Sequence, residues 1–241
     1  MILYYVRHGD PTYKPDALTP LGHRQAEAVG RRIARYGIDR IYSSTSTRAY
    51  QTALPLSELV KKDIVQMDWC HEKYAYADML IHDEEGRRWW MNDYPPIRTL
   101  LSQEKVRRLG NAWYEAPGLE KYRDQFKAGI ERVNGHVDAF MRELGYVHDR
   151  EAGVYHVEKQ NNERVALFAH AGFGRLFLSS VLGVSYADFA VHTDMCHTGV
   201  TVIDFSAQDG GVCIPRMMTY SNDAHLYGDD LPTDYNFRVR L

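Results

Sequence analysis

Apolar and polar positions along the chain fall into short blocks with the signature of buried strands. Residues 2–6 (ILYYV) form a continuous apolar run that stops at Arg7. Such a run is typical of a strand that is covered on both faces of a sheet. Similar runs predict further strands over residues 38–42, 63–67, 164–169, 198–205 and 212–220.

Between these runs, apolar residues recur at the three- and four-residue spacing of helices. The first such segment starts at Thr19-Pro20, where threonine can cap a helix and proline suits its first turn, and Gly37 ends it. The same spacing predicts three more helices, over 47–60, 119–144 and 172–182. Strands that alternate with helices indicate an α/β sandwich.

Two stretches depart from this alternation. Residues 68–118 mix tryptophans, prolines and charges without a sustained period, and residues 146–163 are mostly polar. We interpret the first as an insertion and the second as a hairpin or an exposed loop. The chain has 241 residues and no internal repeat, so we predict a single domain over 1–241 with an insertion at about 68–118.

Composition and charge exclude several classes of partner. The formal net charge of −3 argues against a general nucleic-acid-binding surface. No apolar run approaches the roughly 20 residues of a membrane span, so no membrane association is expected. The three cysteines are scattered, with no CxxC pair, which favours a reducing compartment. We therefore expect a cytoplasmic protein, while the sequence carries no signal for its oligomeric state.

Charged and nucleophilic side chains follow three of the predicted strands. Arg7 and His8 come directly after the first strand, Arg48 follows the second, and His170-Ala171 follows residues 164–169 at the start of a helix. In open α/β folds, ligands bind outside the carboxyl ends of the strands. These three strand ends therefore present two arginines and two histidines to one edge of the sheet.

This set of groups suits phosphoryl transfer. The guanidinium fork matches phosphate oxygens, and the start of a helix adds backbone N–H groups and a partial positive charge, here at Ala171. A neutral imidazole between such groups can attack phosphorus and form a covalent phosphohistidine. We expect the second ring nitrogen of that imidazole to donate to a backbone carbonyl, which fixes its tautomer.

Four ordered motifs carry a resemblance to a known family. The segments YYVRHGD, LTPLGHRQAE, IYSSTSTRAYQTA and FAHAGFGRLFLS, followed by CHTGVTVIDF and NDAHL, resemble the histidine phosphatase superfamily, also called the phosphoglycerate mutase-like family. The resemblance spans roughly residues 2–67 and 164–226. It implies a three-layer α/β/α sandwich with a mostly parallel central sheet.

The resemblance also implies roles for individual residues. His8 becomes the phosphorylated nucleophile, and Arg7 and Arg48 become the phosphate clamps. His170 becomes the second histidine, expected to be cationic and to stabilise charge on the transferred oxygens. These four side chains should converge around one oxyanion.

The general acid and one phosphate ligand are assigned less directly. The family places a carboxylate after the third strand, and Glu72 is the nearest match, with Glu84 and Glu85 as alternatives. Many members have asparagine six residues after the nucleophile, where this chain has Lys14. That lysine either holds phosphate as a point charge or extends into water.

The 11 histidines raise the question of a metal site. No HExxH, HxH or Cys-His cluster at ligand spacing occurs, and phosphate-binding loops and dinucleotide fingerprints are also missing. We therefore expect no metal and no cofactor.

The leading hypothesis is a metal-independent phosphomonoesterase of the histidine acid phosphatase type that acts on a small phosphorylated metabolite. One alternative is a phosphoglycerate mutase-type phosphotransferase that uses the same site. A second alternative is a catalytically silent phosphate-binding module. Specificity is expected in residues 73–118 and 146–163.

Overall fold

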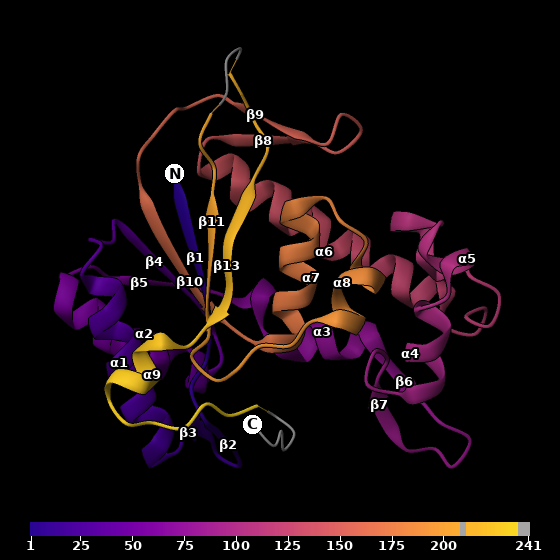
Figure 1. Cartoon of the computed structure of the whole chain (residues 1–241), viewed down its shortest axis with the longest axis horizontal. Helices are drawn as coiled ribbons and strands as arrows, with labels where there is room; N and C mark the ends of the chain where they lie inside the picture. Colours follow the sequence, from indigo (N-terminus) through magenta and orange to yellow (C-terminus); the bar gives the residue numbers. More distant parts are fainter. Residues whose placement is uncertain (208–210, 236–241) are drawn as a thin grey trace.

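A mostly parallel sheet of six strands forms the centre of the fold (Figure 1). The computed structural model describes residues 1–207 and 211–235 of the chain. The strand order is β13-β11-β1-β10-β4-β5, in which only β11 runs antiparallel to the other five strands. The bounds are β1 Ile2–Arg7, β4 Arg40–Ser44, β5 Ile64–Met67, β10 Arg164–Ala169, β11 Val200–Asp204 and β13 Arg216–Asn222.

Helices cover both faces of this sheet and make it the middle of three layers. On one face lie α1 (Pro20–Ala34), α2 (Thr47–Val60) and the short α9 (Ala224–Gly228), on the left of Figure 1. On the other lie α3 (Glu72–Met79), α6 (Arg123–Glu143) and α7 (Ala171–Leu182). Successive residues of β1 serve the two cores: Leu3 and Tyr5 pack toward α6 and α7, and Tyr4 and Val6 toward α1 and α2. The expected α/β/α fold class is confirmed.

The helix boundaries follow local chemistry, which the sequence had indicated for the start of α1. The Thr19 side chain caps α1 by accepting from the Gly22 N–H, and Pro20 occupies the first turn. Ser46 caps α2 by accepting from the Ala49 N–H. Gly183 ends α7 with a φ of 67°, a left-handed conformation that glycine adopts without strain.

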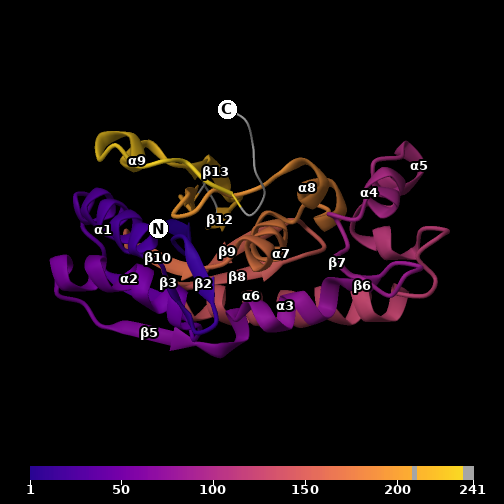
Figure 2. The ribbon, with the colours of Figure 1, turned by 90° about the horizontal axis from the view of Figure 1, so that it is seen from below.

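Residues 68–118 add no strand to the central sheet. They form a 3-10 turn η1 (Asp68–Cys70), α3, the hairpin β6 (Leu80–His82) and β7 (Arg88–Trp90), α4 (Pro95–Leu101), α5 (Glu104–Arg107) and the 3-10 turn η2 (Gly110–Glu115). Most of this segment lies to the right of the sheet in Figures 1 and 2. Trp113 is fully buried there and packs against Phe126 and Tyr186.

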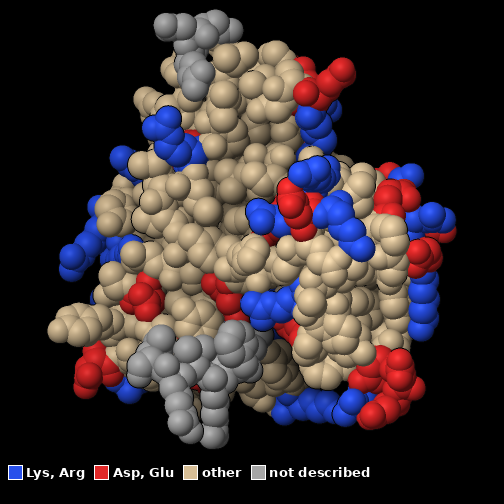
Figure 3. All heavy atoms as spheres, turned by 45° about the vertical axis from the view of Figure 1, so that its right-hand side comes forward, with Lys and Arg blue, Asp and Glu red and all other residues tan. Residues whose placement is uncertain are grey.

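The surface around this segment carries charges of both signs. Figure 3 shows Lys and Arg interspersed with Asp and Glu on this side of the molecule. Several of them are paired, such as Arg107 with Asp188 and Arg87 with Asp83, both at 2.8 Å. A largely exposed pair such as Arg107 with Asp188 contributes little to stability, and the mixed charges form no single-sign patch in this view.

The prediction of one strand over 212–220 is wrong. The segment divides into β12 (Val212–Cys213), which pairs with β9 (Val154–Val157) of a separate sheet, and β13 of the central sheet. Pro215 lies between them, and because proline has no N–H it cannot continue a ladder. The predicted hairpin is present, formed by β9 and β8 (Tyr146–Asp149).

Three short elements were not predicted. These are the hairpin of β2 (Pro11–Tyr13) and β3 (Asp16–Leu18), helix α8 (Tyr186–His192) and helix α9. Each is too short to show a period in the sequence. Among the described residues, no helix combines the length and apolar character needed to cross a membrane.

Candidate active site

Three neighbouring strands bring the predicted residues to one edge of the sheet. In the parallel register, Arg7 lies opposite Ala169 and Phe168 lies opposite Ser43, so β1, β10 and β4 end side by side. The His8 N–H donates to the Ala169 carbonyl at 2.9 Å. The two histidine segments are therefore fixed to each other by the backbone before any side chain is considered.

The glycine after His8 is required by a close approach to α1. A Cβ atom on Gly9 would lie 2.7 Å from the carbonyl oxygen of Gly22. The Gly9 N–H donates to Thr52 Oγ1 of α2 at 3.0 Å. The first two sequence motifs thus pack directly on each other at the base of the site.

His8 is held as a neutral imidazole with one nitrogen available. Its ring is almost fully buried, and its Nδ1 lies 2.7 Å from the Gly9 carbonyl oxygen. Because a carbonyl only accepts, Nδ1 carries the proton and the lone pair is on Nε2, the tautomer expected from the sequence. Burial, with the charges of Arg7 and Arg48, lowers the pKa of His8 well below its ordinary value.

His170 lies beside His8, with the ring centroids 5.3 Å apart. Arg48 Nη2 donates to its Nδ1 at 3.1 Å, and its Nε2 lies 2.9 Å from Ser44 Oγ. Tyr5 Oη accepts from the His170 N–H and donates to the His170 carbonyl. Both ring nitrogens and both backbone polar groups of His170 therefore have hydrogen-bond partners within the protein.

The expectation that His170 is cationic is wrong for this arrangement. Nδ1 accepts from a guanidinium, so only Nε2 can carry a proton. Burial, followed by the charges of Arg48, His71 and Arg7, lowers the pKa of His170 well below its ordinary value. The two imidazoles are neutral together because two buried cations beside two arginines would repel each other.

The two arginines have different surroundings. Arg7 is completely buried, and its Nη1 donates to the Met195 carbonyl. Arg48 is 7% exposed and donates through Nη1 to Asp16 Oδ1 at 2.5 Å. Asp16 belongs to the β2–β3 hairpin, so this hairpin reaches over the site to the second arginine.

Glu72 is brought to the same place by the start of α3. Its two carboxylate oxygens accept from the backbone N–H groups of Gly172 and Phe173 in the first turn of α7, at 3.1 and 2.8 Å. Burial raises the pKa of Glu72, while these hydrogen bonds and Arg48 oppose the rise. The alternatives Glu84 and Glu85 are exposed in the turn between β6 and β7.

The last two predicted residues, Ala171 and Lys14, differ in burial. Ala171 is the first residue of α7 and is buried, with His170 as the N-cap. Lys14 is exposed in the turn of the β2–β3 hairpin, so its predicted contact with phosphate stays a prediction.

Sequence reasoning missed a second carboxylate and imidazole group at the site. The rings of His197 and His8 lie 5.9 Å apart, and His197 Nδ1 lies 3.8 Å from Asp10 Oδ1. Donor atoms of Asp10, His197 and Asp234 lie within 4.8 Å of one another, a spacing at which three ligands can hold a metal ion. Asp10 lies within the quoted segment YYVRHGD and His197 within CHTGVTVIDF. Because nearly the whole chain separates them, no sequence pattern predicted their contact.

A further contact supports the backbone of His8 from behind. The Thr198 N–H donates to the His8 carbonyl at 3.2 Å. Thr198 Oγ1 donates to the His197 carbonyl and accepts from His225 Nε2 at 2.9 Å. Arg32 Nη1 lies 3.3 Å from the other ring nitrogen of His225. A neutral His225 can make both of these contacts, whereas a protonated His225 would place its positive charge next to the guanidinium group of Arg32.

We expect His225 to make stability fall in acid. Burial and Arg32 lower its pKa to about 4, whereas the unfolded chain keeps the ordinary value near 6.5. Between these values the unfolded state binds more protons, so the free energy of unfolding falls as the pH falls, by up to about 3 kcal/mol at pH 4. Urea unfolding of the wild type and of His225→Gln across this range measures the effect.

The variant His225→Gln separates the contribution of His225 to this pH dependence from that of the other histidines. Because His225→Gln cannot titrate there, its destabilisation relative to wild type should shrink toward pH 4. Parallel stability profiles of the two proteins would show that His225 does not carry the effect.

Comparisons with known proteins find similar sequences and similar folds. A family model described as the histidine phosphatase superfamily (branch 1) matches residues 3–213. Two curated relatives come from Hydrogenobacter thermophilus. A protein provisionally named phosphoserine phosphatase 2 is 33% identical over 97 residues, which are 36% of this chain and 45% of that protein, so less than half of it is covered. Phosphoserine phosphatase 1 is 24% identical over 200 residues, which are 78% of this chain and 79% of its own.

Solved structures share the fold. A phosphoserine phosphatase of Entamoeba histolytica in complex with phosphoserine superposes with a TM-score of 0.58 at 17% identity, covering 93% of this chain and 98% of that one. A mycobacterial glucosyl-3-phosphoglycerate phosphatase gives a TM-score of 0.56 at 18% identity, covering 91% and 98%. At these identities the likeness concerns the fold alone.

Proposed function

The chain belongs to the histidine phosphatase superfamily, and from this premise we propose that it is a phosphomonoesterase that works through a phosphohistidine at His8. The substrate class is a small phosphorylated metabolite. The observation that carries the proposal is the convergence of two imidazoles and two guanidinium groups at three adjoining strand ends, with the Glu72 carboxyl group bound to the first turn of α7 beside them. The phosphatase names of the two curated relatives support the same class.

The first step transfers the phosphoryl group to the protein. Arg7 and Arg48 hold the phosphate oxygens, and Arg48 exchanges its contact with Asp16 for the substrate. His8 Nε2 attacks phosphorus in line, the P–N bond forms and the bond from phosphorus to the ester oxygen breaks. Glu72 donates its proton to the departing oxygen, which leaves as an alcohol.

The second step hydrolyses the phosphohistidine. Glu72, now a carboxylate, accepts a proton from water while the water oxygen attacks phosphorus. The P–N bond breaks, His8 recovers its lone pair and inorganic phosphate departs. The raised pKa of Glu72, caused by its burial, favours the protonated form that the first step requires.

The positive groups stabilise charge that the substrate brings. A phosphoryl dianion at Arg7 and Arg48 introduces negative charge next to His170 and therefore favours its protonation. When Arg48 Nη2 turns from His170 Nδ1 to the phosphate, that nitrogen can take up a proton. His170 is therefore cationic only when the substrate is present. Preorganised donors of this kind each contribute about 10²–10³-fold to catalysis in other hydrolases.

A panel of phosphorylated metabolites tests the proposal, with released phosphate as the readout. We expect release from at least one small monoester, with a chelator present throughout because Asp10, His197 and Asp234 could bind a metal. Activity lost with the chelator and restored by a metal would contradict a metal-independent reaction. Isomerisation of 3-phosphoglycerate without net phosphate release would indicate a mutase instead.

Replacing Glu72 with glutamine should affect substrates according to their leaving groups. An alkyl ester such as phosphoserine needs a proton on its departing oxygen, so its turnover should fall about 10²–10⁴-fold. The p-nitrophenolate ion leaves without a proton, so the first turnover of p-nitrophenyl phosphate should fall less than about tenfold. Rapid-mixing measurements of the first turnover provide the comparison.

The exposed Glu84 supplies a matched control. Glu84→Gln should leave both substrates unaffected. Equal losses on both substrates for Glu72→Gln would mean that Glu72 does not act as the acid for the leaving group.

A further inference from the structure

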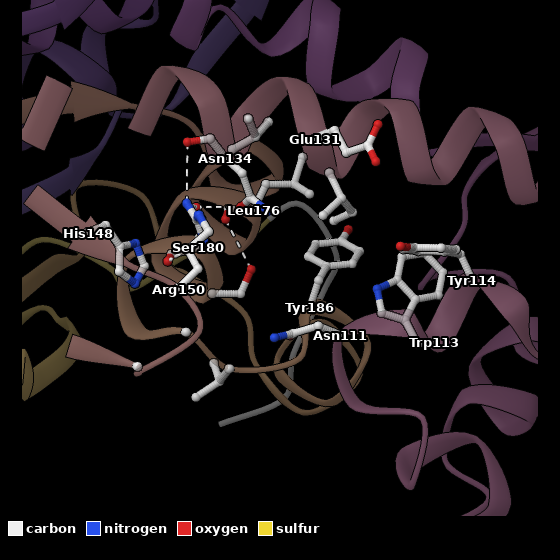
Figure 4. Close-up of a pocket in the computed structure, with 16 residues that line it drawn as sticks. Asn111, Trp113, Tyr114, Glu131, Asn134, His148, Arg150, Leu176, Ser180 and Tyr186 are labelled. Carbon is white, nitrogen blue, oxygen red and sulfur yellow. Dashed lines mark hydrogen bonds between the residues drawn. The ribbon is translucent and has the colours of Figure 1, made fainter. Parts of the chain in front are cut away.

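A pocket lies on the opposite half of α7 from the candidate active site. It is formed by α6, the C-terminal half of α7, η2 and the loop between β8 and β9, and its volume is about 250 Å³ (Figure 4). His170 caps the N-terminus of α7, whereas Leu176, Ser179 and Ser180 line the pocket. None of the residues assigned to phosphoryl transfer lines it.

The pocket has an aromatic side and a hydrogen-bonding side. Figure 4 shows Trp113 and Tyr114 on its right-hand side and Tyr186 next to them in the middle, with the Trp113 and Tyr186 rings 5.7 Å apart. Trp113 and Tyr186 are buried and form the floor, and Tyr114 is the more exposed ring of the three. Asn134 and Ser180 stand at the other end, joined by a hydrogen bond of 2.7 Å from Ser180 Oγ to Asn134 Oδ1. A ligand that satisfies both ends combines a flat ring with hydroxyl or amide groups.

The charges of the lining favour an uncharged ligand. Arg150 is already paired: it donates twice to Asp138, at 2.9 and 2.7 Å, and also to Ser180 Oγ at 2.9 Å. Its charge is therefore neutralised by a partner in the protein. Glu131, which also lines the pocket, is exposed at the rim, where water screens it. An anionic or cationic ligand would lose its hydration here without gaining a counter-ion.

We propose that this pocket binds an uncharged nucleoside, or a molecule of the same chemistry, and that binding raises the activity of the site at the other end of α7. Pockets for drug-sized ligands measure about 300–1,000 Å³, so the observed volume suits a smaller molecule. The base of a nucleoside would pack on the aromatic side, and its ribose hydroxyl groups would bond to Asn134 and Ser180.

A short series of contacts joins the pocket to the general acid. Tyr186 Oη accepts from Trp90 Nε1 at 3.2 Å. The ring of Trp90 lies so close to Gly172 that a Cβ atom there would overlap it, and the same Cβ would lie 2.8 Å from Glu72 Oε1. Gly172 in turn donates its N–H to that oxygen. These contacts form a continuous path from Tyr186 to the carboxyl group of Glu72.

The direction of the effect follows from this packing. A ligand that packs on Tyr186 stabilises the arrangement in which Trp90 and Gly172 hold Glu72. The occupied pocket should therefore favour the state that is competent for proton donation. This second part of the inference rests on the proposed function, whereas binding in the pocket does not.

Adenosine is a suitable probe because it has no phosphate and cannot be a substrate. Ligand-observed NMR with the full chain should show binding to the wild type. Val184 is 43% exposed at the rim of the pocket, and Val184→Trp should close it and remove the signal. Val65 on β5 is 53% exposed, and Val65→Trp is the matched control that should still bind. No signal with the wild type, or an equal signal with Val184→Trp, would overturn the site.

Kinetics test the connection to Glu72. Saturating adenosine should raise the turnover of phosphoserine by about fivefold, at the lower end of typical coupling between two sites, and leave the first turnover of p-nitrophenyl phosphate unchanged. Tyr186→Phe should still bind adenosine but lose the activation, because the hydrogen bond to Trp90 is removed. Binding without activation, or equal activation of both substrates, would contradict the connection. If Glu72→Gln shows no dependence on the leaving group, the proposed function fails and the binding result stands alone.

Discussion

Replacing His8 with alanine is expected to lower the turnover of p-nitrophenyl phosphate by about four orders of magnitude or more, the loss typical when a covalent nucleophile is removed. The physical reason is that the neighbouring imidazole of His170 is not placed to take over as the nucleophile. His170 Nδ1 already accepts from Arg48, and its Nε2 lies against Ser44. Steady-state release of p-nitrophenolate measures the loss.

Circular dichroism and thermal unfolding should show that His8→Ala retains the fold. His23 is exposed on α1, and His23→Ala should keep full activity as the matched control. Retention of more than about one hundredth of the activity by His8→Ala would be too much for a covalent nucleophile and would contradict the assignment.

Replacing Arg7 with lysine should cost about 10²-fold or more in kcat/KM, although the charge is kept. Arg7 is completely buried, and one nitrogen of its fork is already used to donate to the Met195 carbonyl. The shorter-reaching ammonium group of lysine cannot make that contact and hold a phosphate oxygen at the same time. Both kcat and KM for p-nitrophenyl phosphate should be determined, together with inhibition by inorganic phosphate.

Arg40 provides the comparison for this substitution. It begins β4 at the opposite end of the sheet and pairs with Glu163 at 2.9 Å. Arg40→Lys should change kcat/KM by less than about twofold, as expected of a partly exposed ion pair away from the site. If Arg7→Lys behaves like Arg40→Lys, Arg7 acts as a point charge rather than as a bidentate clamp.

The sequence was most informative where local chemistry decides the structure. Some element boundaries are set by residues that are neighbours in the sequence. Examples are the apolar run of β1, the Thr19 cap with Pro20 at the start of α1, and Gly183 after α7. Parallel strands align their carboxyl ends, so placing His8 and His170 after two such strands was enough to bring them together. The family resemblance, drawn from the motifs, is confirmed by the match over residues 3–213.

The parts that the sequence did not reveal depend on distant contacts. His197 and Asp10 meet only because β11 pairs with β1, and Asp16 reaches Arg48 only because a hairpin of three-residue strands folds over α2. Neither of these two contacts produces a periodic pattern in the sequence. The neutrality of His170 was also out of reach because burial and two neighbouring guanidinium groups determine it, not the identity of the residue.

The proposed roles of the site residues and the boundary of the insertion remain predictions. The structure brings Glu72 rather than Glu84 or Glu85 to the start of α7, which gives the acid assignment a geometric basis that the sequence lacked. The exposed Lys14 has no such basis. The experiments above address the roles one residue at a time.

The most direct measurement is to trap the phosphorylated protein. Wild-type protein is mixed with a phosphomonoester that it hydrolyses, and the reaction is quenched in alkali, in which phosphohistidine survives. The protein is then digested for mass spectrometry. We expect phosphate on His8, which should be lost after acid treatment and missing from His8→Ala. Phosphate on any other residue, or none at all while turnover proceeds, would contradict it.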